Sequence, residues 1–219
     1  MFFPSCKINA AFPEESSRLA DYLEKRFGIA KTDCCRINRT KLTEKDTAIV
    51  VCHTCAAILE ESSLASQILY AWELIDRDDD FPFPDYQGES ITLQDCYMAR
   101  ARTHLHEVVR SLLKKMNFKV VELEHNRNEA NFCGLRTLEP LADNQRLAPK
   151  HYCLPEAFTP LVAEERANFL KQYVAQYKTK LTVAYCGACR KAMIQGGAQT
   201  VHLLELLFPN DHLSRSKRL

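Results

Sequence analysis

Two Cys-x-x-Cys pairs, Cys52–Cys55 and Cys186–Cys189, most constrain what this chain can fold into. Each pair directly follows a short apolar run that contains β-branched residues, at 47–51 and at 181–185, and each is followed by a helical pattern. Parallel strands in α/β proteins end at one edge of the sheet, where ligands usually bind. We therefore expect each pair of thiols to lie at such an edge, where a strand meets a helix.

The remaining cysteines repeat the same order in the two halves of the chain. A lone cysteine ends a strand, a central Cys-Cys pair or single cysteine follows, and the Cys-x-x-Cys pair comes last. The first set is Cys6, Cys34, Cys35, Cys52 and Cys55. The second set is Cys96, Cys133, Cys186 and Cys189. Of the ten cysteines, Cys153 alone stands outside both sets, in a proline-rich segment.

This repeated order favours metal binding over two alternatives, a thioredoxin-like dithiol and a scatter of small buried hydrophobic residues. The start of the chain, Met1–Cys6, has no basic segment followed by an apolar one. A secreted disulfide framework is therefore the weaker interpretation, and we expect a cytoplasmic protein. Zinc in a structural site takes four ligands, which the second set can supply. The five cysteines of the first set suit an iron–sulfur cluster better, because a cluster offers several iron atoms to ligate.

Hydrophobic periodicity predicts an α/β fold of two related cysteine-rich units, each a small, mainly parallel sheet flanked by helices. We expect the first unit at 1–80, the second at 88–208 and a basic tail at 209–219. Acidic residues and prolines near 77–87 predict a linker, with a surface loop inside one domain as the alternative. The expected helices are 13–27, 56–60, 64–75, 102–116, 161–177 and 199–208. The expected strands are 2–6, 47–51, 90–93, 118–123 and 181–185.

Composition argues against several classes of function. The 29 basic and 28 acidic residues leave a net charge of +1, which is not that of a generally cationic nucleic-acid binder. No apolar run reaches the roughly 18 residues that a membrane span requires. The chain also has no Gly-rich phosphate loop, so we expect it to hold neither a nucleotide nor a flavin.

The cysteine order resembles the CCG-domain family, the cysteine-rich iron–sulfur proteins of heterodisulfide reductases. Relatives of that family include iron–sulfur subunits of lactate-, glycolate- and glycerol-phosphate-oxidising systems. Residues 92–97 are similar to the family's strand that ends in His-Asp-Pro-Cys, and residues 131–134 to its Phe-Cys-Cys-Gly. Residues 48–55 are similar to its strand and Cys-x-x-Cys, and residues 201–207 to its closing helix. The resemblance covers roughly 1–208.

The resemblance implies that each complete motif holds a noncubane [4Fe–4S] cluster through five cysteines. The first set matches such a motif in full, and the second matches it with four ligands. In the family, two clusters reductively cleave a disulfide. The resemblance thus implies an electron-transfer subunit of an oxidoreductase complex. Its expected partners are a ferredoxin-type iron–sulfur subunit, which supplies the electrons, and a flavoprotein of the same complex.

The chain departs from the family pattern in three places. Phe132 stands where the second Cys-Cys pair would have a cysteine, Arg36 stands where the first motif would have glycine, and only 16 residues separate Cys35 from Cys52. An ordinary four-cysteine cluster, an altered cluster and zinc all stay open for the second set. The alternative function is a non-catalytic zinc- or single-cluster-binding module that serves assembly or redox sensing.

Two histidines receive a specific prediction. We expect His53, inside the first Cys-x-x-Cys pair, to be an exposed loop residue, with a hydrogen bond to cluster sulfur as the alternative. We expect His106 to lie on the surface of its helix.

Overall fold

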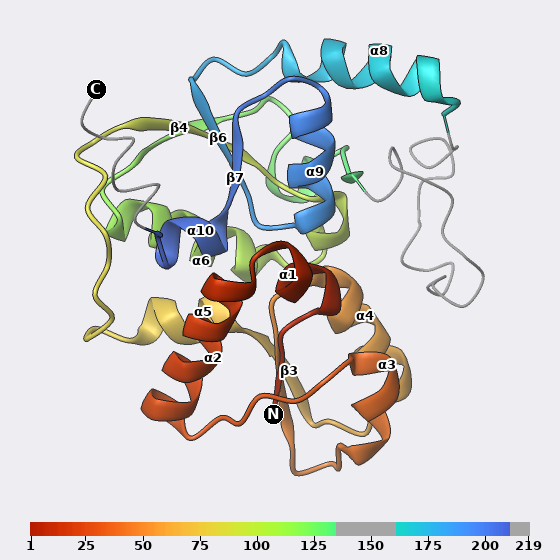
Figure 1. Ribbon diagram of the computed structural model, residues 1–219, viewed down its shortest axis with the longest axis vertical. Helices are drawn as coiled ribbons and strands as arrows, with labels where there is room; N and C mark the ends of the chain where they lie inside the picture. Colours follow the sequence, from red (N-terminus) through yellow and green to blue (C-terminus); the bar gives the residue numbers. More distant parts are fainter. Residues whose placement is uncertain (135–160, 211–219) are drawn as a thin grey trace. The chain divides into compact units, whose positions relative to one another are not determined.

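The computed structural model describes residues 1–134 and 161–210, which form two compact units. Unit 1 comprises Met1–Pro84 and the residues from Leu204 onward, and unit 2 comprises Asp85–Leu203. Each unit is built on a parallel sheet with helices against it, so the α/β class with two mainly parallel sheets is confirmed (Figure 1).

Unit 1 has a three-stranded parallel sheet in the order β1-β2-β3. Its strands are β1 (Phe2–Phe3), β2 (Thr47–Val50) and β3 (Gln67–Tyr70). Its helices are α1 (Cys6–Ala11), α2 (Pro13–Phe27), α3 (Cys35–Asn38), η1 (Arg39–Lys41), α4 (His53–Ser62) and α5 (Ala71–Arg77). The helix α2 begins with Pro13 and ends at Gly28, whose φ of 66° is the left-handed conformation that glycine adopts without steric cost.

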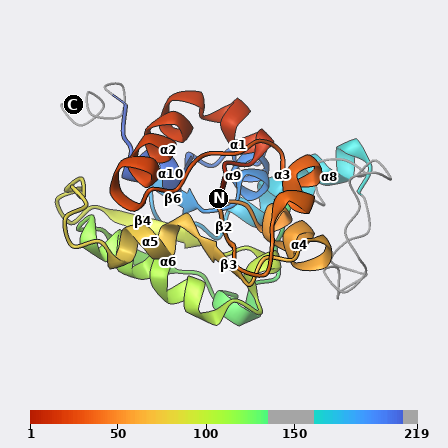
Figure 2. The ribbon, with the colours of Figure 1, turned by 90° about the horizontal axis from the view of Figure 1, so that it is seen from below.

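Unit 2 has a four-stranded parallel sheet in the order β5-β4-β6-β7. Its strands are β4 (Ser90–Gln94), β5 (Lys119–Glu122), β6 (Leu181–Ala184) and β7 (Thr200–His202). Its helices are η2 (Tyr97–Ala99), α6 (Thr103–Lys115), η3 (Arg127–Glu129), α8 (Ala163–Val174) and α9 (Gly187–Gln195). Helix α10 (Leu203–Leu207) begins at the end of β7 and continues into unit 1. Within unit 2, α6 lies on one side of the sheet and α9 on the other (Figure 2).

The two sheets have the same strand order. In unit 1, Lys31 forms a single parallel bridge to Phe2, on the side of β1 away from β2. That bridge lies beside β1 in the place that β5 occupies beside β4. If the strands of each unit are numbered by their order in the chain, both sheets therefore have the spatial order second, first, third, fourth. In unit 1, the strand that corresponds to β5 is therefore reduced to a single bridging residue, Lys31, which precedes Cys34 and Cys35 in the chain.

Two expected helices are wrong in part, and in the same way. Residues 64–75 contain strand β3 before helix α5, and residues 199–208 contain strand β7 before helix α10. Both strands are three or four residues long and pair with the strand that carries a Cys-x-x-Cys pair at its end. Apolar residues at a spacing of four in such a short segment fit a helix as well as a strand followed by a helix, so periodicity alone does not separate them.

The expected linker is in part an anchored piece of unit 1. The buried carboxylate of Asp78 accepts a hydrogen bond of 2.6 Å from the Tyr22 hydroxyl and two of 2.8 and 2.9 Å from the Arg26 guanidinium. Unit 1 extends to Pro84 because of contacts of this kind. Residues 204–208, which we expected in the second unit, group with the first.

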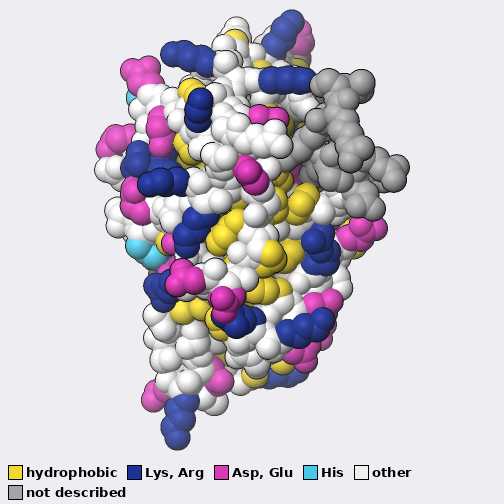
Figure 3. All heavy atoms as spheres, turned by 90° about the vertical axis from the view of Figure 1, so that its left-hand side faces the viewer, with side chains coloured by type: hydrophobic (Ala, Val, Ile, Leu, Met, Phe, Trp, Pro, Cys, Tyr) yellow, Lys and Arg dark blue, Asp and Glu magenta, His cyan; other side chains and the backbone are white. Residues whose placement is uncertain are grey.

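Several expectations fall outside the described residues. They concern Cys153, the proline-rich segment around it and most of the basic tail. Among the described residues, no helix is both long and apolar enough to cross a membrane. Acidic and basic side chains are intermixed over the face shown in Figure 3, in keeping with the near-zero net charge.

Candidate metal centres

The second cysteine cluster, which we define as Cys96, Cys133, Cys186 and Cys189, gathers at the carboxyl edge of the unit 2 sheet. Cys96 follows β4 and Cys186 follows β6, the two strands between which the chain order reverses. Such a switch point is where open α/β sheets bind ligands. The Sγ atoms of Cys96, Cys186 and Cys189 all lie within 4.8 Å of one another, and Sγ of Cys133 lies 3.7 Å from that of Cys96. The group of Cys96, Cys186 and Cys189 could hold a metal ion, and Cys133 lies beside it.

The second cysteine cluster is closed. Cys96, Cys133 and Cys189 are buried, and only Cys186 is half-buried. The backbone N–H of Gly134 donates a hydrogen bond of 3.4 Å to Sγ of Cys189. A Cβ atom at Gly134 would lie 2.7 Å from the backbone nitrogen of Cys189 and would overlap the carbonyl group of Ala188. The two chain segments that carry these cysteines thus touch backbone to backbone, and only glycine permits this approach.

An aromatic wall covers the same cluster. Phe132 is buried, and its ring stacks on Tyr173 with 4.4 Å between the centroids. The hydroxyl groups of Tyr173 and Tyr177 both donate to Oε1 of Gln94, at 3.2 and 2.7 Å. Phe132, at the position where the resemblance expects a fifth cysteine, is thus part of the packing that seals the cluster.

Three thiols of the second cysteine cluster have shifted pKa values, and the shifts differ in direction. Burial raises the pKa of Cys96 well above its ordinary value, and a hydrogen bond with Cys133 does the same for Cys189. For Cys186, a hydrogen bond with Cys133 raises the pKa, but those from Cys189 and Cys96 to its thiolate outweigh it and bring the pKa to about 7. Negative charges this close together oppose one another, and a bound cation would permit all four thiols to ionise.

A buried ion pair supports the strand end that carries Cys96. The Asp95 carboxylate accepts hydrogen bonds from the Arg110 guanidinium, the Tyr185 hydroxyl and the backbone N–H of Arg127, at 2.7, 2.7 and 2.8 Å. Arg110 also pairs with Glu122 on β5 at 2.7 Å. Since Asp95 precedes Cys96 directly, this network fixes where β4 ends and therefore where the Cys96 thiol lies.

The first cysteine cluster, which we define as Cys34, Cys35, Cys52 and Cys55, lies at the corresponding edge of unit 1 with its thiols in pairwise interaction, whereas the group of three sulfurs within 4.8 Å of one another found among the described residues is in unit 2. The Cys35 thiol interacts with those of Cys55 and Cys34, and Cys55 also interacts with Cys52. The hydrogen bond with Cys55 lowers the pKa of Cys35, and the same bond raises that of Cys55. Cys34 and Cys52 are half-buried, so this cluster is more open than the second.

The fifth cysteine of the first set lies apart from these contacts. Cys6 is the first residue of α1, at the end of β1, and its side chain is exposed. Because β1 and β2 are parallel neighbours, Cys6 and Cys52 lie at the same edge of the sheet. The described residues include no hydrogen bond between Cys6 and another cysteine. No disulfide joins the nine described cysteines.

Both histidine predictions are wrong. His53 is buried and begins helix α4, and its Nδ1 lies 2.8 Å from the Tyr70 hydroxyl at the end of β3. His106 is buried on the inner face of α6, and desolvation lowers its pKa. Sequence spacing had a usable signal for His53, since the first turn after a buried strand packs against the neighbouring strand end.

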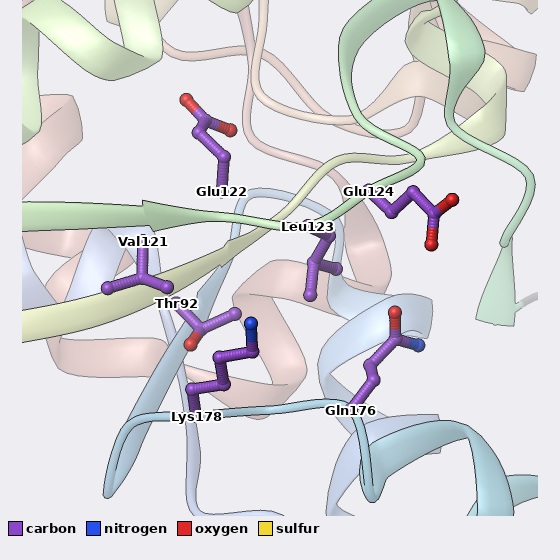
Figure 4. Close-up of a pocket in the computed structure, with 7 residues that line it drawn as sticks. All are labelled: Thr92, Val121, Glu122, Leu123, Glu124, Gln176 and Lys178. Carbon is purple, nitrogen blue, oxygen red and sulfur yellow. The ribbon is translucent and has the colours of Figure 1, made fainter.

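A separate pocket in unit 2 has a volume of about 140 Å³ and contains no cysteine (Figure 4). Its lining residues are Thr92, Val121, Glu122, Leu123, Glu124, Gln176 and Lys178. Sites for drug-sized ligands have volumes of about 300 Å³ and more. This pocket is too small for a nucleotide or flavin, and the cysteine clusters are the stronger candidates for chemistry.

Comparison of the chain with protein-family models, with curated proteins and with solved structures found no match. The two clusters and the sheets that position them are therefore the basis for assigning a function.

Proposed function

We propose that this chain is an iron–sulfur-binding electron-transfer subunit of a heterodisulfide-reductase-like oxidoreductase complex. One observation carries the proposal. In both units, cysteines gather at the switch point of a parallel sheet with the same strand order. A scatter of structural cysteines has no reason to occupy the same topological position twice.

The first cysteine cluster is the proposed working site. Its four interacting thiols, with Cys6 at the same sheet edge, offer five sulfur ligands to an iron–sulfur cluster. Such a cluster supplies one-electron redox chemistry when bound. Cys6 is exposed and Cys34 half-buried, so a two-electron acceptor such as a disulfide can approach this edge. Cleavage of a disulfide into two thiols consumes two electrons and two protons. In this proposal an iron–sulfur partner protein delivers the electrons.

Anaerobic purification with metal and sulfide analysis tests the proposal. The expected product is a brown protein with iron and acid-labile sulfide. Both should fall to background in a Cys52→Ser/Cys55→Ser double variant. A matched control is Ser62→Ala/Ser63→Ala, at the far end of the same helix α4. A colourless wild-type protein without sulfide would contradict the proposal.

A non-catalytic module for assembly or redox sensing is the second candidate. The closed second cysteine cluster favours it, because structural metal sites are closed whereas catalytic ones keep an open position. If zinc alone is found at both clusters, this candidate replaces the first.

A further inference from the structure

We propose that the second cysteine cluster is a mononuclear tetrahedral site for one zinc ion, and that this ion holds unit 2 together while the first cluster alone exchanges electrons. The division of roles rests on the proposed function, but the assignment of zinc does not. It depends on three observations in unit 2: the distances between sulfur atoms, the contact between the ligand-bearing segments and the aromatic cover.

The sulfurs of Cys96, Cys186 and Cys189 lie close enough together to ligate one ion, and that of Cys133 contacts Cys96. Four thiolates around a tetrahedral zinc, each with a Zn–S bond of about 2.3 Å, have sulfur atoms about 3.8 Å apart. The Cys96–Cys133 sulfur distance is 3.7 Å, and the mutual distances of Cys96, Cys186 and Cys189 stay within 4.8 Å. In a four-iron cluster each cysteine binds a different iron atom, so its sulfurs lie farther apart than around a single ion.

The backbone around the cluster leaves no space to widen it. Gly134 follows Cys133, and Ala188 precedes Cys189, so these two ligands are carried by segments already in contact. A virtual Cβ at Gly134 overlaps the Ala188 carbonyl, which means that even a methyl group does not fit there. Separating the sulfurs to the span of a four-iron cluster would require this contact to open.

The aromatic cover supports a structural role. Phe132 contributes an apolar ring at the position of a fifth ligand, and that ring is buried against Tyr173. The backbone N–H of Tyr97 donates a hydrogen bond of 2.8 Å to the Phe132 carbonyl, which ties this segment to the residue after Cys96. A site with four protein ligands and no open position holds a fold rather than a substrate.

The first cluster differs in its ligand set and in its exposure. Its set has a fifth cysteine, the exposed Cys6, and two of its four interacting cysteines are half-buried. The central Cys34-Cys35 pair is intact where the second unit has Phe132-Cys133. Two units of the same topology thus carry one open and one closed centre.

Metal analysis of paired variants of the full chain, purified anaerobically, tests the assignment. The wild type should contain one zinc per chain in addition to iron and sulfide. Cys186→Ser/Cys189→Ser should lose the zinc, and Cys52→Ser/Cys55→Ser should keep it while losing iron and sulfide. Phe132→Cys should leave the iron content unchanged. If the wild type carries no iron but the zinc follows Cys186 and Cys189, the proposed function fails while this assignment stands.

Cobalt substitution gives a second measurement that does not depend on a folded variant. Wild-type chain loaded with Co²⁺ in place of zinc should show the intense visible bands of a tetrahedral cobalt–thiolate site, including sulfur-to-cobalt charge transfer.

Three results of the metal analysis would overturn the assignment. They are loss of iron and sulfide from Cys186→Ser/Cys189→Ser, a gain of iron in Phe132→Cys, and one iron without sulfide at this site. A wild type without zinc whose cobalt form lacks tetrahedral bands would overturn it as well.

Discussion

At the scale of single residues, Asp95 contributes most clearly to the position of a candidate ligand. Its carboxylate is buried at the end of β4 and accepts hydrogen bonds from three different segments of unit 2. Asn in its place keeps the shape but removes the fully buried one of the two carboxylates, those of Asp95 and Glu122, that pair with the Arg110 guanidinium. Breaking a buried pair in this way costs about 3 kcal/mol. We therefore expect Asp95→Asn to lower the free energy of unfolding by about that amount, measured by urea denaturation of the metal-loaded chain.

The same variant has an expected pH dependence. The pKa of Asp95 lies below its ordinary value because, although desolvation raises it, the hydrogen bonds and charge of Arg110 and the N–H of Arg127 outweigh that effect. A carboxyl group of this kind contributes stability above its unfolded pKa of about 4, and the contribution is lost as the pH falls through the folded pKa. The wild type should thus lose more stability than Asp95→Asn on acidification below about pH 4. The exposed Glu124→Gln is the control, and equal pH profiles for wild type and Asp95→Asn would contradict this account.

Gly134 gives a second prediction at this scale. Ala at this position places a methyl group against the Ala188 carbonyl and 2.7 Å from the Cys189 nitrogen, so the two segments must separate. We expect Gly134→Ala to lose the metal of the second cysteine cluster, with the content of the first cluster unchanged. Metal analysis measures both. Gln195→Ala, exposed at the end of α9, is the control, and retention of the second metal in Gly134→Ala would be evidence against a tight fit.

At the scale of elements, the sequence predicts strands and helices best where several signals agree. Helix α2 has a proline at its start, an apolar stripe and a glycine at its end, and its bounds are confirmed. Strands β3 and β7 were missed because each runs directly into a helix, without a turn residue between them. Their strand character depends on pairing with β2 and β6, a tertiary contact that periodicity does not contain.

In the candidate site, too, local sequence patterns predict some features, and others depend on tertiary contacts. That the Cys-x-x-Cys pairs lie where a strand meets a helix follows from local patterns, and the structure agrees. The convergence of Cys133 on Cys96, and the exposure of Cys6, depend on how distant segments pack. The burial of His106 was missed for the same reason, since a histidine on a helix gives no local sign of which face it occupies, whereas the position of His53 directly after a buried strand did give a local signal.

The end of the described chain gives a prediction about an element. Phe208 is buried in unit 1, where its ring lies edge-on to those of Tyr22 and Phe81, and the Arg18 guanidinium donates a hydrogen bond to the Pro209 carbonyl. Truncating a buried phenylalanine to alanine costs about 3–5 kcal/mol. We expect Phe208→Ala to destabilise unit 1 by that order and to lower hydrogen-exchange protection in α2.

The control for this variant is Phe169→Ala, which removes a ring that is 39% exposed in unit 2. Its effect should be well below that of Phe208→Ala. Unchanged protection of α2 in Phe208→Ala would mean that residues 204–210 are not part of the cooperative structure of unit 1.

At the scale of the whole molecule, the two units combine one sheet topology with two kinds of cysteine cluster. Unit 1 has a sheet shortened by one strand and an open cluster, and unit 2 has a full sheet and a sealed one. A duplicated scaffold can keep a metal for folding in one copy and use the other for chemistry, because each edge is built from its own loops. Under the proposed function, electrons would enter and leave the chain at the unit 1 edge.

The proposed function requires a source of electrons outside the chain. The sequence has no Gly-rich loop that would cradle a nicotinamide or flavin cofactor, and the pocket between β5 and the segment after α8 is too small for one. NADH alone should therefore leave the visible absorption of the anaerobic, metal-loaded chain unchanged, whereas dithionite should bleach it. A reduced ferredoxin-type iron–sulfur protein should bleach it as well, because it transfers single electrons through a surface contact. Cys52→Ser/Cys55→Ser should show no such change with any donor. Bleaching of the isolated wild-type chain by NADH would mean that it accepts hydride directly, and that it does not depend on a partner protein.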